Sequence, residues 1–311
     1  MSAVRNADRW MFGYGSPVAL GLFRAVFASI VFVSLAMTAI DFEAWYTESG
    51  YVPVANLETW AGGFSFFSPL SHVVDPRTTA VVYGLTMLAA LTTAFGLWSR
   101  ASSIALLVGV VSLHHRSPLI LHSGDTLARA MLLFIALAPS GRACSLDRLF
   151  ALRKGETDLI KPVSLWPQRM MQVQMATLYI ATVWHKSLGA TWMDGTATHY
   201  PLNLNEFARF AAPSWLDAQP VLAVTTWGTL VIELAMGTLV FSKPLRRTVL
   251  TCGLALHAGI EVLFNIPIFA FFVTSCYIVF YEGEEVERWL AMVGDRMRRP
   301  KLARMGAGGV R

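Results

Sequence analysis

The sequence contains long apolar tracts, of which residues 17–40 form the clearest. A helix needs roughly 20 mostly apolar residues to cross the hydrocarbon core of a bilayer. Eight tracts approach this length, and they cover residues 17–40, 78–98, 101–121, 127–139, 165–184, 221–241, 249–264 and 267–281. They predict an all-α fold: a polytopic transmembrane helix bundle of about eight spans.

Composition supports the same class. Hydrophobic residues make up 55% of the 311 residues and charged residues only 14%, whereas a soluble domain carries about 25% charged residues. This balance excludes a soluble cytosolic protein and also a disordered chain, which needs low hydrophobicity and high charge. Three cysteines cannot build a disulfide scaffold. We expect the lipid bilayer to be the main partner of the chain.

The basic residues predict an orientation. Most of the 25 lysines and arginines fall in loops that share one side if the chain starts in the cytoplasm and crosses eight times. Positive charge accumulates on the cytoplasmic side of membrane proteins, so it does not indicate nucleic-acid binding here. We therefore expect a multi-pass protein of the plasma (inner) membrane with both termini in the cytoplasm and no nucleic acid as partner.

A short segment after the last tract has helical periodicity. Apolar residues recur at helical spacing from Val286 to Met297, opposite arginines. This pattern is typical of an amphipathic helix on anionic headgroups. We accordingly divide the chain into a transmembrane domain, residues 1–285, and a cytoplasmic amphipathic tail, residues 286–311.

Ionisable residues inside the apolar tracts are candidate functional residues, because each costs at least about 2.5–3.5 kcal/mol at bilayer depth. His257 and Glu261 are four residues apart and share one helix face. With Arg129 they could form a proton relay or an ionic clamp. The alternative is a set of buried structural pairs without chemistry. The full set is Arg24, Arg129, Glu233, His257 and Glu261.

A second polar group gathers between the third and fourth tracts and at the end of the fifth. Its histidines and aspartate are residue types that bind zinc or iron, but their spacing matches no metal-site pattern, and we predict no metal. Neither a P-loop, a G-x-S-x-G motif nor a C-x-x-C motif occurs in the sequence. The group comprises His114, His115, Arg116, His122, Asp125, His185 and Lys186.

Lys186 is the most informative member of this group. It lies between Trp184 and Trp192, where partial desolvation would favour the neutral amine, a base. The competing interpretation is a lysine that extends from a helix end to the membrane interface.

Two segments resemble the vitamin K-dependent γ-carboxylase superfamily and its bacterial HTTM-domain relatives. They are HSGDTLARAMLLFIALAPSGRACSLD, residues 122–147, and VWHKSLGATWMDGTATHY, residues 183–200. The segment SGYVPVANLE, residues 49–58, also fits. The resemblance covers roughly residues 15 to 285.

The resemblance implies a chemistry. In the carboxylases a lysine before the Trp-x-x-Gly element deprotonates reduced vitamin K, and oxygenation of this quinol provides the base that removes a glutamate γ proton. Carried over, this role falls on Lys186, and the implied cofactor is reduced vitamin K or another quinol. The predicted catalytic residues are Lys186, His185, Asp125 and His122. The predicted cofactor-binding residues are Trp184, Trp192, Arg129, His257 and Glu261.

The chain departs from the carboxylases after its last tract. The carboxylases carry a large luminal portion that holds protein substrates, so we expect a small or peptide substrate for a quinol-linked enzyme of this shorter form. The alternative is a non-enzymatic maturation or scaffold partner for a secreted peptide or a membrane protein, because the membrane-only form also resembles the B component of a bacterial system that matures a sporulation-delaying toxin. Aromatic residues of the outer loops would then form the adhesive surface; they are Trp45, Trp60, Phe64, Phe66, Phe67 and Trp215. A transporter ranks last, because the sequence has no internal repeat.

Overall fold

The computed structural model describes residues 2–61, 70, 72–157 and 160–298. Its described part is helical apart from short turns, loops and one two-stranded antiparallel sheet that pairs β1 (Tyr14–Gly15) with β2 (Val163–Ser164). The all-α prediction is therefore confirmed.

Every predicted tract forms a helix. In chain order these helices are α2 (Val18–Thr38), α5 (Pro76–Phe95), α6 (Ser99–Arg116), α7 (Ser123–Leu137), α9 (Trp166–Ser187), α12 (Gln219–Thr238), α13 (Lys243–Leu263) and α14 (Phe269–Ser275), which η7 (Cys276–Phe280) continues. The shorter helices are α1 (Ser2–Phe12), α3 (Phe42–Tyr46), α4 (Val54–Ala61), α8 (Leu146–Arg153), α10 (Ala190–Met193), α11 (His199–Asn203) and α15 (Gly283–Arg298). Single 3-10 turns complete the fold: η1 (Ala39–Asp41), η3 (Pro118–Ile120), η4 (Ser140–Arg142), η5 (Ser214–Asp217) and η6 (Leu239–Phe241).

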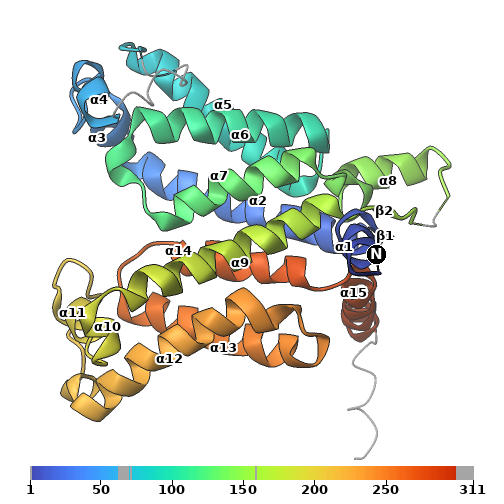
Figure 1. Ribbon diagram of the computed structural model, residues 1–311. Helices are drawn as coiled ribbons and strands as arrows, with labels where there is room; N and C mark the ends of the chain where they lie inside the picture. The colour runs from blue at the N-terminus through green and yellow to red at the C-terminus, as the bar shows by residue number, and fades with distance from the viewer. Residues whose placement is uncertain (1, 62–69, 71, 158–159, 299–311) are drawn as a thin grey trace, which may run out of the picture.

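The long helices pack side by side in one bundle (Figure 1). Helix α5 packs between α2 and α6, and α6 packs on α7. Helix α9 packs on α12, which packs on α13, and α13 contacts α14. Helices α7 and α14 contact each other, and α7 also contacts α9. The contacts of α7 with α14 and α9 thus join a first group of helices, α2 and α5 to α7, to a second group, α9 and α12 to α14. The two groups enclose one apolar core that includes Phe23, Phe27, Met131 and Phe272.

The predicted number of spans is wrong. Within the described residues, three helical segments are long and apolar enough to cross a membrane: Val18–Tyr46, Pro76–Phe95 and Gln219–Phe241. Helix α7 has 15 residues and spans only about 22 Å, against a hydrocarbon core of about 30 Å. The apolar segment Phe269–Phe280, formed by α14 and η7, is likewise too short. Helices α6, α9 and α13 contain polar residues that their packed neighbours accommodate. In the first turns of α9, for example, Gln168 and Gln172 both donate to Val279 O.

The connecting segments separate toward two ends of the bundle. Helices α1, α8 and α15 lie at one end, and α3, α4, α10 and α11 lie at the other (Figure 1). Helix α1 near the N-terminus, α8 and the C-terminal helix α15 thus share one end of the bundle.

The helix after the last tract is present, as α15. Its first turns pack on protein, because Val286 is buried against Val18, Ala19 and Ala143. Ser16 donates to the carboxylates of Glu284 and Glu287. The expectation that the apolar face of this helix lies on lipid headgroups is therefore wrong for its first turns. The side chains beyond Val293, including Met297, lie outside the described residues.

Arg24, a charge inside α2, is completely buried. Its guanidinium donates to Ser140 O at 3.2 Å and to Cys144 O at 2.5 Å. Gly96, the residue that follows α5, has a left-handed φ of 67° and packs directly against this guanidinium. Arg24 thus ties α2 to the loop after α7, which is a structural role.

Two acidic residues cap helices at the ends of the bundle. The side chain of Asp147 accepts from Trp98 N, Ser99 N and Ser99 Oγ, all within 2.8 Å, at the start of α6. Asp75 caps α5, and hydrogen bonds from Thr78 hold the pKa of its carboxyl below the ordinary value. These caps satisfy amide groups that a helix leaves free in its first turn.

We predict that Arg24→Ala lowers the free energy of unfolding by about 2–4 kcal/mol, because the buried carbonyl oxygen of Ser140 and the part-buried one of Cys144 lose a charged donor. Thermal or denaturant unfolding of the detergent-purified protein measures this change. Arg100→Ala, at an exposed arginine of α6, is the matched control and should change stability little. Equal stability of the two variants would contradict the structural role of Arg24.

Candidate functional site

The site begins with an ion pair between two neighbouring helices. Lys186 lies in the last turn of α9, and Glu233 lies in α12. Lys186 Nζ donates to Glu233 Oε1 at 2.5 Å. The side chains are 23% and 10% exposed, respectively. A partly buried ion pair of this kind lowers the cost of keeping each charge away from water.

The amine also lies on an aromatic ring. Lys186 Nζ is 4.7 Å from the centroid of the Trp192 ring, in cation–π geometry. Trp192 belongs to the short helix α10, which packs against both α9 and α12. The carboxylate and the ring therefore fix the position of the amine.

A cavity of about 460 Å³ lies next to the pair. Most of its wall is apolar, and its polar groups include Lys186, Glu233, Tyr179 and His257. The remaining lining residues include Leu127, Leu178, Phe207, Ile260, Phe264 and Phe269. We call this space the Lys186 cavity. An apolar cavity with a few converging polar groups is the usual form of a small-molecule site.

A second hydrogen-bond network begins at the wall of the same cavity, at Tyr179 and His257. Tyr179 Oη lies 3.1 Å from His257 Nε2 and 3.0 Å from Tyr277 Oη. All three side chains are buried. Two buried atoms of the lining residues, Glu233 Oε2 and His257 Nδ1, have no hydrogen-bond partner among the described residues. Such atoms normally acquire a partner from a water or a ligand.

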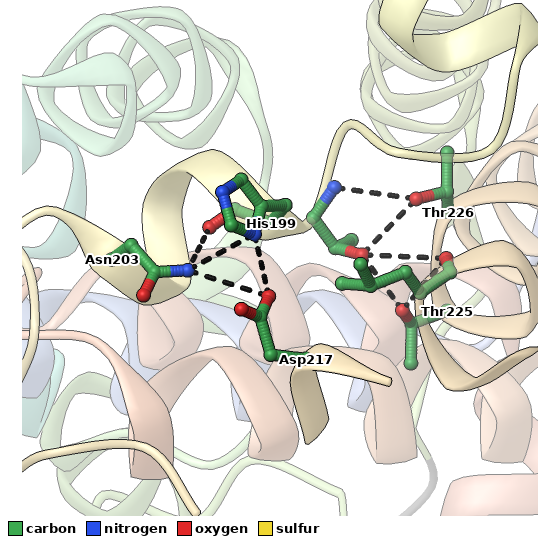
Figure 2. A network of polar contacts seen from close by, with 7 residues as sticks. His199, Asn203, Asp217, Thr225 and Thr226 are labelled. Carbon is green, nitrogen blue, oxygen red and sulfur yellow. Dashed lines mark hydrogen bonds and ion pairs between the residues drawn. The ribbon is translucent and has the colours of Figure 1, made fainter. Parts of the chain in front are cut away.

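The cavity is covered at one end by α11. Tyr200 and Pro201 line the cavity, while His199 Nδ1 lies 2.6 Å from Asp217 Oδ1. Figure 2 shows His199, Asn203 and Asp217 converging on one side, and Thr225 and Thr226 on the other. This network fixes α11 to η5, and the hydrogen bond from Thr198 N to Thr226 Oγ1 fixes the start of α11 to α12.

Two predicted catalytic residues, His122 and Asp125, have a capping role at the start of α7. His122 Nδ1 accepts from Gly124 N, and Asp125 Oδ2 accepts from His122 N at 2.8 Å. They line a separate cavity of about 320 Å³, together with His114. The Phe269 ring contacts both the His122 ring and the His257 ring, so it lies between this group and the Lys186 cavity.

The proposed clamp with Arg129 is not formed. Arg129 Nη2 donates to Thr126 Oγ1, whereas Glu261 pairs with Arg209 at 3.3 Å. Glu261 lines another cavity, and of the three residues of the proposed clamp His257 is the one that lines the Lys186 cavity. His257 and Glu261 share one face of α13, as their spacing predicted, but each lines a different one of two neighbouring cavities.

Trp184 and His185 do not line the cavity in the described structure. The Trp184 side chain is 63% exposed, and His185 is exposed on the same turn of α9. The expectation that both tryptophans enclose Lys186 therefore holds only for Trp192.

Glu233 and Tyr179 are the residues that the predicted site lacked. The sequence signal for Glu233 was present, since an acidic residue in the middle of an apolar tract needs a partner. Nothing in the sequence identified Lys186 as that partner, because the two residues are 47 positions apart. Tyr179 carries no sequence signal, since a tyrosine in an apolar helix is common in protein cores.

Comparison with known proteins identifies one family. The sequence pattern of the HTTM-domain family matches residues 15–284 of the chain. No curated protein and no solved structure matched the chain.

We predict that Lys186→Met and Glu233→Gln destabilise the protein more singly than together. Each single change leaves one buried polar group without its partner, at a cost of about 3 kcal/mol for the buried carboxylate, whereas the double variant contains no charge at this position. A double-mutant cycle of unfolding free energies in detergent measures the coupling. Additive effects of the two changes would show that the pair does not form.

Proposed function

The chain belongs to the HTTM-domain family, the domain found in vitamin K-dependent γ-carboxylase-like membrane proteins, and on this premise we propose that it is a membrane enzyme that deprotonates a lipid-soluble quinol in the Lys186 cavity. The observation that carries this proposal is the Lys186–Glu233 pair at the wall of an apolar cavity. In the carboxylases that this chain resembles a lysine has this role, and Lys186 is the lysine of the segment, residues 183–200, that carries the resemblance.

The residues fit a quinol in size and polarity. A cavity of about 460 Å³ is within the range of small-molecule sites, roughly 300–1,000 Å³. Its aliphatic and aromatic wall suits a fused ring system. Glu233 Oε2, which lacks a donor within the described structure, could accept from a phenolic hydroxyl. When bound, a quinol would supply that acidic hydroxyl and two electrons for oxidation.

Lys186 and Glu233 would act as one proton-accepting unit. In a charged pair the carboxylate is the base, and in a neutral pair the amine is the base. In both arrangements one proton from a hydroxyl at Glu233 Oε2 would convert the pair to a protonated carboxyl and an ammonium group. The charged pair would take the proton directly on the carboxylate. The neutral pair would take it on the carboxyl while the carboxyl's own proton passes from Oε1 to the amine, and in both cases the ammonium group would stabilise the anion that is left. Trp192 would orient the unit through its contact with the amine, and Tyr179 would shape the neighbouring wall of the cavity.

The orientation in the membrane is part of the proposal. Basic residues are frequent in α1 and in the segments around α8 and α15, which share one end of the bundle (Figure 1). We place this end in the cytoplasm. The Lys186 cavity, near the opposite end, would then open toward the outer leaflet and receive a small or peptide substrate from outside.

A maturation or scaffold function is the second candidate, and one observation favours it. Tyr200, Phe207, Phe210 and Trp215 are exposed aromatic residues in the segment that covers the Lys186 cavity. Exposed aromatic clusters are typical of protein interfaces. The aromatic residues Phe64, Phe66 and Phe67, which were also expected in this surface, lie outside the described residues, as does the Trp60 side chain.

We predict that purified protein consumes reduced vitamin K in the presence of oxygen and that Lys186→Met or Glu233→Gln lowers this rate about 100-fold or more, the usual contribution of a general base. Oxygen uptake and product chromatography measure the rate. His185→Ala, at the exposed neighbour of Lys186, is the matched control and should keep most of the rate. No consumption above the uncatalysed rate by the folded wild-type protein would contradict the proposal.

Binding is tested independently of turnover. An azido-quinone photolabel should modify peptides that line the Lys186 cavity. Ile260→Trp fills this cavity and should abolish the labelling. Leu254→Trp, at an exposed position of the same helix, should leave it unchanged. The scaffold function is supported instead by two results together. The photolabel does not modify peptides of the cavity, and replacement of the exposed aromatic residues removes a co-purifying partner.

A further inference from the structure

A groove of about 760 Å³ lies beside α2 and is larger than the Lys186 cavity. One wall of the groove is formed by α2, and the other by the turn between α13 and α14 and by Phe271. Arg209 and Glu261 lie in its lining, and its remaining surface is predominantly apolar. The residues from α2 are Ala25, Val26, Ser29, Ile30, Val33 and Met37.

The apolar part of this groove matches the dimensions of a lipid chain. Residues 25 to 37 of α2 cover about 18 Å at 1.5 Å per residue, and one half of the hydrocarbon core of a bilayer is about 15 Å thick. Helix α2 belongs to the most apolar candidate span. Val33, Met37 and Phe271 are exposed, so a chain can enter sideways from the surrounding lipid.

The groove contains a charged pair that the backbone positions. Arg209 N donates to Leu263 O at 3.1 Å, and Asn265 N donates to Phe207 O at 2.7 Å. These bonds place Phe207 in the wall of the Lys186 cavity and Arg209 in the wall of the groove. The two sites are therefore neighbours, but they use different side chains.

The pair offers groups of both signs to a ligand. Arg209 Nη2 donates to Glu261 Oε1 and Phe264 O, both at 3.3 Å. Both bonds use one nitrogen of a side chain that is 44% exposed, so a phosphate can approach the rest of the guanidinium. Glu261 Oε2 has no donor in the part of the chain that the structure describes. A guanidinium binds phosphate and a carboxylate binds an ammonium group, so the pair complements a headgroup that carries both charges.

We propose that this groove binds one membrane phospholipid with a primary ammonium headgroup. The phosphate would contact Arg209, the ammonium would donate to Glu261, and one acyl chain would lie along α2. A choline headgroup carries the same charges but has no N–H group to donate. The site therefore distinguishes phosphatidylethanolamine from phosphatidylcholine, and its function does not depend on the quinol chemistry of the Lys186 cavity.

Native mass spectrometry of the full chain, offered equal amounts of dioleoyl phosphatidylethanolamine and dioleoyl phosphatidylcholine, tests the proposal. The wild-type protein should retain the ethanolamine lipid about tenfold better, the effect of one charged hydrogen bond. Glu261→Gln should bring this ratio close to one, while Arg209→Gln should weaken both lipids. Glu206→Gln, an exposed carboxylate of the same loop, should keep the wild-type ratio.

A second pair of variants tests the place of the acyl chain. Ser29→Trp fills the groove from an exposed position of α2 and should abolish retention of the lipid. Val81→Trp adds the same side chain at an exposed position of α5 and should not.

Three outcomes would overturn the proposal. They are equal retention of the two lipids by the wild type, an unchanged ratio in Glu261→Gln, and a dimer that Ser29→Trp converts to monomers, which would make the groove an interface between two copies. Ile260→Trp should not alter the lipid ratio, so a failure of the quinol proposal is seen separately.

Discussion

The cost of placing charge among apolar helices governs the arrangement of this protein. An unpaired ion away from water costs several kcal/mol, and the cost falls only when a partner is close and well oriented. Arg24 meets this condition through two carbonyl oxygens, and Lys186 through Glu233. Arg116, which is also fully buried, donates to Val52 O and to Glu48. Each of these contacts joins segments that are distant in the sequence.

The two segments that resemble the carboxylase superfamily have different physical roles. In the first, His122, Asp125 and Asp147 cap the starts of α7 and α6, so a pattern that suggested an active site also has a structural explanation. In the second, Lys186 and Trp192 form part of the ion-pair site. A shared motif can therefore reflect helix geometry as much as chemistry.

Helix α13 separates the two cavities to which we assign ligands. His257 and Ile260 line the Lys186 cavity, while Glu261 lines the groove beside α2. The turn that follows α13 also separates the cavities, because Phe264 lines the Lys186 cavity and Asn265 lines the groove. A quinol site and a phospholipid site would thus share one structural wall, and both would be reached from the lipid phase.

The sequence by itself determined the helices and the family, because a long apolar run and its caps are local properties of the chain. It also marked Lys186 and Glu233 as ionisable residues in or at the ends of apolar tracts. It overestimated the number of spans, since a polar residue in a helix is tolerated or not according to the neighbours that cover it, as with Gln168 and Gln172 in α9. Only the tertiary structure decided that Glu233 pairs with Lys186 and Glu261 with Arg209. The physical reason is that these partners depend on which helices pack together and at what rotation about their axes, and neither property is encoded within a single segment.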